Sequence, residues 1–280
     1  MAAITTVITG STSGIGKVTA MELAKKGHAI YMLVRNTEKG EQVKKEIISL
    51  TGNKNIYVIK CDVSELQSVR EAAEELKSKL FNINILINNA GSAFLEKQTS
   101  KDGFEMTFAL NHLGHFLLTR ELMPLLEKGH ARIINVSSEA HKNAKPNFDD
   151  LNWEHTPYKG FPAYGISKLY NIYFTKSLSE KYGDKGIRAY ALHPGVVNTN
   201  IWEGAKGFLG LVVWVLKLFM ITPEKGAETT IYLATQPKLE QKSGLYFKKC
   251  KVAKTAPIAD DAGARNQLWD ISEKLVNVNK

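Results

Sequence analysis

Short apolar runs alternate along the chain with stretches in which apolar residues recur at helical spacing. The strand-like runs are Thr5–Thr9, Ala29–Val34, Ile56–Ile59, Ile83–Ile87, Arg132–Val136, Arg188–Leu192 and Leu245–Phe247. The helical stretches are Gly16–Lys26, Thr37–Leu50, Glu65–Leu80, Ala163–Tyr182, Glu224–Thr235 and Asp260–Asn277. Buried strands joined by helices are typical of parallel sheets with right-handed crossovers. We therefore expect an α/β fold with a doubly wound parallel sheet of about seven strands.

Two segments break this alternation, at about residues 139–162 and 200–222. Both follow strands, so we expect both at the carboxyl edge of the sheet, where open α/β folds bind ligands. The second is strongly apolar and would suit a helix pair in the core, a dimer interface or a peripheral membrane contact. Because no linker or repeat divides the chain, residues 1–280 are expected to form a single domain.

Composition places the chain among ordinary soluble proteins, with 44% hydrophobic and 23% charged residues. The net charge of +9 comes from 37 basic and 28 acidic residues that are scattered, so we expect no nucleic-acid partner. Two distant cysteines, Cys61 and Cys250, exclude a disulfide framework and indicate a reducing, cytoplasmic location. The run Gly207–Ile221 is shorter than the roughly 20 residues of a spanning helix and contains Lys217.

A glycine-rich turn follows the first strand-like run and leads directly into a helical stretch. It reads Gly10-Ser11-Thr12-Ser13-Gly14-Ile15-Gly16. Glycines allow positive φ angles and let the backbone approach a pyrophosphate, while the free N–H groups of the following helix bind phosphate. In this position the turn predicts a dinucleotide site, for which Gly10, Ser11, Ser13, Gly14, Ile15 and Gly16 are the expected contacts.

The second strand-like run ends at Arg35, where an NAD-binding protein would carry an acid. A guanidinium forms bidentate bonds with a 2′-phosphate, so Arg35 favours NADP(H). Lys17 is a weaker phosphate candidate. Further cofactor contacts are expected where the third and fourth strands end, at Asp62, Val63, Asn89, Ala90 and Gly91.

Tyr164 and Lys168 are spaced to lie on one face of a helix. An ammonium beside the phenol, together with an oxidised nicotinamide, would lower the pKa of the tyrosine and let it exchange a proton with a substrate oxygen. The fifth strand-like run leads into Ser137 and Ser138, and one of these hydroxyls could bind the substrate oxygen. Asn111 could anchor a water molecule or a backbone carbonyl.

Other catalytic patterns are absent from the sequence. It contains no His-Glu-x-x-His, Gly-x-Ser-x-Gly or Walker sequence, so we expect no metal and no serine nucleophile. His141, His155 and His193 are interpreted as packing or surface residues.

In order along the chain stand TGSTSGIG, CDV, NNAG, NHLGHFLLT, RIINVSSEAH, FDDLNWE, YGISK, HPGVVNT and SGLYFKKCKV. This ordered set resembles the short-chain dehydrogenase/reductase family, in its retinol dehydrogenase-like branch. The resemblance implies a Rossmann fold and a catalytic group of Asn111, Ser138, Tyr164 and Lys168. It also implies that the apolar segment at about 200–222 forms a lid over a lipophilic substrate. Tyr164 and Lys168 would also contact the cofactor, whose carboxamide would be fixed by Pro194, Gly195, Val197 and Thr199.

The resemblance implies an NADP(H)-dependent oxidoreductase that transfers hydride between nicotinamide and an apolar alcohol, aldehyde or ketone of retinoid, fatty-aldehyde or sterol type. The alternative is a catalytically silent NADP(H)-binding interaction or redox-sensing protein, which intact Ser138, Tyr164 and Lys168 disfavour. Membrane-bound relatives often carry an amino-terminal anchor. None is expected here, because the chain opens on a strand-like run. A homodimer and a tetramer are equally compatible with the sequence.

Overall fold

The structure is a computed structural model that describes residues 3–195 and 221–278. Most of the apolar segment at 200–222, with Val197 and Thr199, lies outside the described residues.

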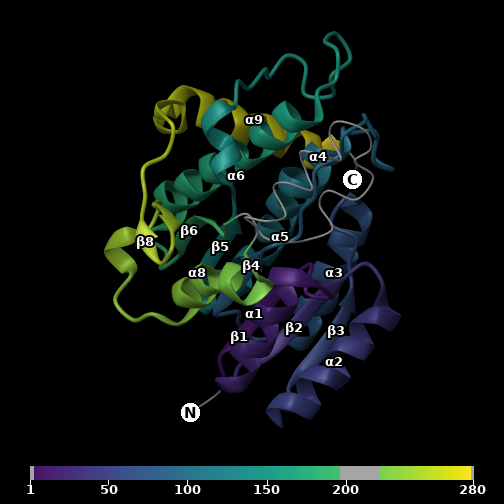
Figure 1. Ribbon diagram of the computed structural model, residues 1–280, viewed down its shortest axis with the longest axis vertical. Coiled ribbons are helices and arrows are strands. Elements are labelled where there is room, and N and C mark those ends of the chain that lie inside the picture. Colours follow the sequence, from purple (N-terminus) through teal and green to yellow (C-terminus); the bar gives the residue numbers. More distant parts are fainter. Residues whose placement is uncertain (1–2, 196–220, 279–280) are drawn as a thin grey trace.

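All the strands belong to one sheet in the order β3-β2-β1-β4-β5-β6-β7-β8 (Figure 1). Their bounds are β1 Thr5–Thr9, β2 Ala29–Val34, β3 Ile56–Lys60, β4 Ile85–Asn88, β5 Arg132–Val136, β6 Arg188–His193, β7 Tyr246–Lys248 and β8 Lys251–Val252. Every neighbouring pair is parallel except β7 with β8, so the expected doubly wound sheet is confirmed.

The predicted strand count omitted β8. This two-residue strand pairs with β7 through a tight hairpin in which Lys249 and Cys250 have φ of 51° and 59°. Such a turn usually carries Asn or Gly. Lysine and cysteine gave no sequence signal for it.

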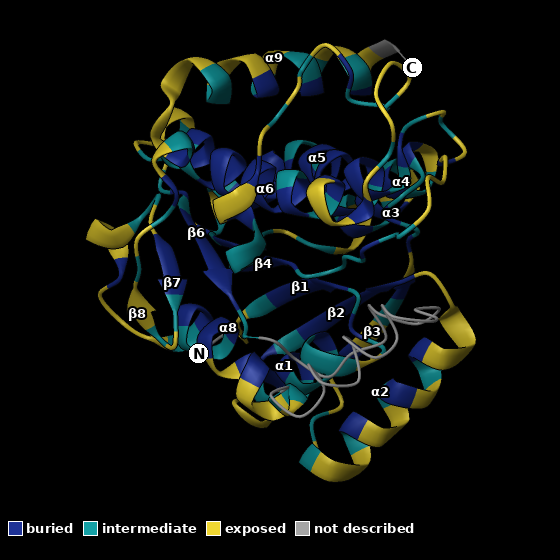
Figure 2. Ribbon diagram, turned by 45° about the horizontal axis from the view of Figure 1, so that its top comes forward, coloured by how far each residue is buried: buried dark blue, intermediate teal, exposed yellow. Residues whose placement is uncertain are grey.

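Helices cover both faces of the sheet because successive strand residues point to opposite sides. On β1, Ile8 packs with the face covered by α1 (Gly14–Lys25), α2 (Thr37–Thr51) and α8 (Pro223–Thr235). Its neighbour Val7 packs with the face covered by α3 (Leu66–Lys79), α5 (Gly114–Lys128) and α6 (Gly160–Tyr182). The last helix, α9 (Ala262–Val278), forms a further layer outside α5 and α6 (Figure 2).

The order in which the chain adds strands to the sheet reverses between β1 and β4. These two strands are hydrogen-bonded neighbours, with Val7 opposite Leu86. The chain runs outward from β1 to β3 and then returns to β4 on the other side of β1. Open α/β sheets bind ligands next to the carboxyl ends of the strands at such a reversal.

The segment that carries Asn111 contains a π-helix. The short α4 (Met106–Phe108) continues into η1, a π-helix over Ala109–Leu113, and then into α5. Single π turns inside α-helices occur frequently at functional sites.

The first predicted substrate segment is partly helical. It begins with the 3₁₀ helix η2 (Glu139–Asn143), and α6 starts at Gly160 rather than at the predicted Ala163. Pro162 lies in the first turn, where proline has no intrahelical hydrogen bond to lose, so it did not mark the boundary.

Candidate active site

The glycine-rich turn is held tightly against the end of β4. Gly10 has a φ of +66°, and a Cβ there would lie 2.9 Å from the Cα of Ala90. The turn leads into α1, whose N-cap Ser13 makes no side-chain capping bond, so the first N–H groups of the helix are not capped from within it. The Ser11 hydroxyl is buried and has no partner among the described residues. A phosphate would satisfy both sets of donors.

Thr9 connects this turn to the β4 loop. Its hydroxyl accepts from the backbone N–H groups of Asn89 and Ala90, both at 2.9 Å. The Asn89 amide returns a bond of 2.9 Å to the Thr9 carbonyl. Asn89, Ala90 and Gly91 are thereby placed beside the glycine turn, as predicted for a shared dinucleotide site.

His115 holds the Thr9 hydroxyl in place, and the sequence analysis gave His115 no role. Its Nδ1 lies 3.3 Å from the Asn111 carbonyl, which can only accept, so Nδ1 carries the proton. Its Nε2 therefore accepts from the Thr9 hydroxyl at 2.9 Å. Burial lowers the pKa of His115 to about 4, which keeps this ring neutral.

At the carboxyl end of β2, Arg35 is exposed and forms no ion pair within the described part of the chain. The Lys60 amine donates to its carbonyl at 2.6 Å. Asp62 uses one carboxylate oxygen to accept from the Ser64 hydroxyl at 2.7 Å, and Val63 follows it as a buried residue. Lys17, the weaker phosphate candidate, is paired with Glu46 at 2.7 Å.

The four residues expected to be catalytic come from three elements. Tyr164 and Lys168 lie on α6, Ser138 ends the loop after β5 as the N-cap of η2, and Asn111 lies in η1. The Ser138 hydroxyl lies beside the Tyr164 phenol and favours its ionised form. The Lys168 amine is 5.5 Å from the centre of the Tyr164 ring and donates to the Val136 carbonyl at 3.0 Å.

Gly91 lets the loop after β4 lie against the side chains of Asn111 and Lys168. A Cβ at Gly91 would lie 2.9 Å from the Asn111 Oδ1 and 3.1 Å from the Lys168 amine. Asn111 is fixed there by bonds of 2.9 Å from its amide to the Ser92 carbonyl and the Ser167 hydroxyl. The candidate cofactor loop and the candidate catalytic residues therefore form one continuous site.

Burial shifts the pKa values of Tyr164 and Lys168 in opposite directions. Desolvation raises the pKa of Tyr164, and the hydrogen bond with Ser138 offsets this only in part. Burial lowers the pKa of Lys168 to about 8, and this side chain is only 3% exposed. The predicted lowering of the Tyr164 pKa refers to the phenol beside an oxidised nicotinamide and stays a prediction, while among the chain's own residues desolvation is the largest influence and raises this pKa.

Two histidines interpreted as packing or surface residues are buried beside Ser138. The His141 Nε2 accepts from the Ala256 N–H at 3.2 Å, so its Nδ1 carries the proton and donates to the Ser138 carbonyl at 2.6 Å. His193 accepts weakly from the Glu139 N–H at 3.4 Å. Each ring connects the Ser138 region to a distant part of the chain, whereas His155 is exposed.

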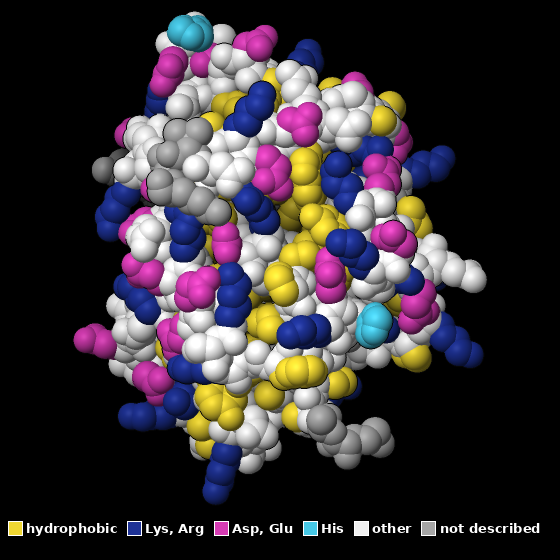
Figure 3. Space-filling model, turned by 180° about the vertical axis from the view of Figure 1, so that it is seen from behind, with side chains coloured by type: hydrophobic (Ala, Val, Ile, Leu, Met, Phe, Trp, Pro, Cys, Tyr) yellow, Lys and Arg dark blue, Asp and Glu magenta, His cyan; other side chains and the backbone are white. Residues whose placement is uncertain are grey.

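Of the residues expected to fix the carboxamide, Pro194 and Gly195 follow β6 directly, and Gly195 has a φ of +103°. No helix within residues 3–195 and 221–278 is long and apolar enough to cross a membrane. In the same ranges no three His, Cys, Asp or Glu side chains gather as a metal site would require. On the face shown in Figure 3, basic and acidic side chains are interspersed.

Residues 5–150 and 152–207 match the family model for short chain dehydrogenases. The chain belongs to this family. Short-chain dehydrogenases are oxidoreductases that use a nicotinamide cofactor.

Among curated proteins of the family, human retinol dehydrogenase 11 is 39% identical over 97% of this chain and 85% of its own. Human retinol dehydrogenase 13 is 40% identical over 98% of this chain and 85% of its own. A crystal structure of an uncharacterised protein from Mycobacterium paratuberculosis superposes with a TM-score of 0.80 at 33% identity, covering 99% of this chain and 94% of that one. The chain is thus a retinol dehydrogenase-like short-chain dehydrogenase.

Proposed function

We propose that this short-chain dehydrogenase is an NADP(H)-dependent reductase of apolar aldehydes or ketones, with Tyr164 as its proton donor. The observation that carries the proposal is the grouping of Ser138, Tyr164 and Lys168, in which the Lys168 amine lies 5.5 Å from the centre of the Tyr164 ring and Ser138 favours the ionised form of the phenol. Because desolvation raises the pKa of Tyr164, its phenol is protonated at neutral pH, which is the form a reduction needs.

Bound NADPH would supply the hydride. The chain's own residues orient the carbonyl and deliver the proton. Ser138 donates a hydrogen bond to the substrate oxygen, and Tyr164 transfers its proton to that oxygen as negative charge develops there. The Lys168 ammonium stabilises the phenolate that results, and Asn111 holds the Ser92 backbone in place. The reverse sequence of proton transfers would serve alcohol oxidation.

The choice of NADP(H) rests on Arg35. Its guanidinium is exposed where β2 ends and forms no ion pair with any described acid, so it is available to a 2′-phosphate. Cofactor contacts from Gly10, Ser11, Ser13, Gly14, Ile15, Gly16, Asp62, Val63, Asn89, Ala90 and Gly91 form part of the same proposal. Pro194, Gly195, Val197 and Thr199 are proposed for the carboxamide.

The substrate class is inferred from two features. The segment at 200–222 is strongly apolar, and the similar human proteins are named retinol dehydrogenases. An apolar lid that closes over the nicotinamide would exclude water and favour a lipophilic carbonyl compound of retinoid, fatty-aldehyde or sterol type.

The proton donor is tested by Tyr164→Phe, which removes the hydroxyl and keeps the ring. We expect kcat for reduction of retinal or decanal to fall by about 10²–10⁴-fold, with NADPH affinity nearly unchanged. Stopped-flow loss of NADPH absorbance and fluorescence titration measure the two quantities. Retention of most activity would overturn the assignment. A wild-type chain that binds NADPH but reduces no carbonyl would favour the catalytically silent alternative.

Cofactor preference is tested by Arg35→Asp, which introduces the acid that a ribose 2′-hydroxyl prefers. We expect kcat/KM for NADPH to fall at least about tenfold relative to that for NADH, because one charge-assisted bidentate contact is replaced by repulsion. Lys17→Gln serves as a control, since Lys17 is paired with Glu46. An unchanged cofactor ratio would show that another residue binds the phosphate.

A further inference from the structure

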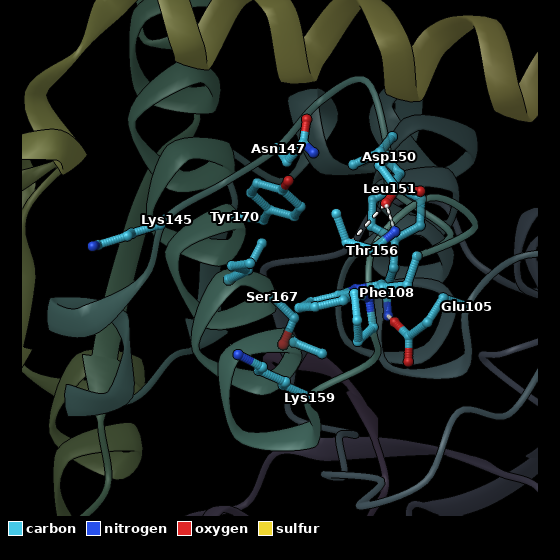
Figure 4. A pocket seen from close by; sticks show the side chains of 14 residues that line it. Glu105, Phe108, Lys145, Asn147, Asp150, Leu151, Thr156, Lys159, Ser167 and Tyr170 are labelled. Atoms are coloured by element: carbon cyan, nitrogen blue, oxygen red, sulfur yellow. Dashed lines mark hydrogen bonds between the residues drawn. The ribbon is translucent and has the colours of Figure 1, made fainter.

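A cavity of about 400 Å³ lies beside α6, and its lining does not include Ser138, Tyr164 or Lys168 (Figure 4). Its walls come from the residues just before α4, from α4 itself, from the loop between η2 and α6, and from α6. This volume falls within the roughly 300–1,000 Å³ of small-molecule sites. The predicted substrate segment at 139–162 therefore encloses space away from the candidate catalytic hydroxyls.

The walls of this cavity are mainly apolar. Phe108, Leu151, Trp153, Ile166 and Tyr170 line it. The Tyr170 hydroxyl is buried without a hydrogen-bond partner among the described residues. In Figure 4 this hydroxyl points toward Asn147, which also lines the cavity.

The two acids in the wall already have hydrogen-bond donors. Glu105 accepts from the N–H groups of Thr107 and Phe108, both at 2.8 Å. Asp150 accepts from the Glu154 N–H at 2.6 Å and from the Thr156 hydroxyl at 2.8 Å. Neither carboxylate therefore needs a hydrogen bond from a ligand.

Unlike the two acids, the two lysines in the wall have no charged or polar partner for their side chains among the described residues. Lys145 and Lys159 are exposed and form no ion pair within the described part of the chain. In Figure 4 both side chains extend to the same side of the cavity. The cavity thus combines an apolar interior with two wall lysines whose ammonium groups have no ion-pair partner among the described residues, a combination suited to an apolar chain that ends in a carboxylate.

We propose that this cavity is a second binding site for a fatty-acid carboxylate, and that its occupancy regulates the enzyme. The route to the candidate active site is Ser167, which lines the cavity. Its hydroxyl donates to the Tyr164 carbonyl at 2.8 Å and accepts from the Asn111 amide at 2.9 Å. A ligand that shifts Ser167 changes the support of both residues. The binding claim is independent of the proposed function, whereas the regulatory claim rests on it.

The probe is dodecanoate below its micellar concentration, titrated by calorimetry against the whole chain. Dodecanol, the neutral analogue, should bind more weakly. The double variant Lys145→Gln/Lys159→Gln should weaken dodecanoate binding about fivefold, since exposed ion pairs are individually weak. Lys26→Gln/Lys254→Gln changes the net charge equally at two exposed lysines elsewhere and should leave the dissociation constant within about twofold.

Location is tested with a photoreactive dodecanoate analogue and peptide mapping. We expect labelling within residues 145–170, and its loss in Leu151→Trp, which fills the cavity from its loop wall. Labelling confined to other peptides, or binding that is indifferent to both the lysine pair and Leu151→Trp, would overturn the site. If Leu151→Trp does not fold, the lysine pair and the mapping still decide.

Regulation is tested by carbonyl reduction at saturating NADPH with and without dodecanoate. A change in kcat that Leu151→Trp abolishes would support the regulatory role. If peptide mapping locates dodecanoate in this cavity but kcat is unchanged, the regulatory role is overturned and the binding site is retained. Binding in a wild-type chain that reduces no carbonyl would separate failure of the proposed function from failure of the site.

Discussion

Among single residues, Lys168 has the environment with the clearest chemical consequence. It is 3% exposed, and burial lowers the pKa of its amine to about 8. Its hydrogen bond to the Val136 carbonyl positions the amine at the edge of β5. The side chain is therefore an ammonium at neutral pH but loses its proton at a pH where an exposed lysine would stay charged.

This environment predicts the pH dependence of carbonyl reduction. The charged form of Lys168 predominates below about 8, so kcat should be constant near pH 7 and fall as the pH rises through about 8. Single-turnover rates between pH 6 and 10 measure this. Lys168→Met should lower kcat at every pH and remove that inflection. An inflection that persists in the methionine variant would belong to another group.

Sequence reasoning proposed the residues of the candidate site but not the bonds that orient them. Helical spacing put Tyr164 and Lys168 on one face, the end of a strand offered Ser137 or Ser138, and the family resemblance selected Ser138. The roles of His115 and His141 depend on the Asn111 carbonyl and the Ala256 N–H, which only the folded chain brings to them. No local pattern encodes such contacts, so the two rings carried no functional signal in the sequence.

Among the elements, α9 depends most on distant packing. Trp269 lies against Phe116 of α5 and Phe174 of α6, with ring centroids 5.0 Å and 6.1 Å apart. The His112 ring meets the Ser272 hydroxyl at 2.9 Å. The helix therefore completes the core on the outer side of α5 and α6, and its contribution to stability comes from the buried side.

The helix α9 offers a matched pair of substitutions. Leu268 is 2% exposed, and Leu268→Ala should lower the free energy of unfolding by about 2–5 kcal/mol, because it removes transfer energy and leaves a void. The adjacent Gln267 is exposed, and Gln267→Ala should stay within about 0.5 kcal/mol. Urea unfolding followed by circular dichroism compares them. Equal effects would mean that α9 does not pack as described.

Element boundaries were less predictable than the elements. The start of α6 at Gly160 lies before Pro162, which the sequence pattern assigned to the preceding loop. The strand β8 has two exposed residues and is recognisable only by its pairing with β7. Apolar periodicity predicts what is buried, so elements with little buried surface leave little trace in it.

For the molecule as a whole, Glu139 connects regions far apart in sequence. Its carboxylate accepts from the Tyr246 hydroxyl at 3.0 Å and from the Lys248 amine at 3.1 Å, both on β7. Burial opposes its ionisation, but hydrogen bonds from Lys142, Lys248 and Tyr246 outweigh this and lower the pKa of Glu139 to about 2. The loop that carries Ser138 is thereby anchored to the far end of the sheet.

This anchor predicts acid sensitivity of the whole fold. Because the folded pKa lies below the ordinary value of 4.5, the stabilisation is fully present above about 4.5 and is lost as the pH falls through about 2. Glu139→Gln should unfold at lower urea at pH 7 and lose less stability between pH 5 and pH 3. Glu96→Gln, at an exposed acid, should follow the wild type. Parallel curves for the wild type and Glu139→Gln would contradict the anchor.

The π-helix at Ala109–Leu113 has an evolutionary consequence. Deleting one residue there would let α4 and α5 join as a regular α-helix, a change that strengthens the backbone ladder. The same deletion would rotate Asn111 by about 100° relative to one of its flanking helices, since each α-helical residue turns the chain by that angle. Selection must therefore reject a locally favourable deletion. Among related chains, the number of residues between Glu105 and His115 should vary less than their identities.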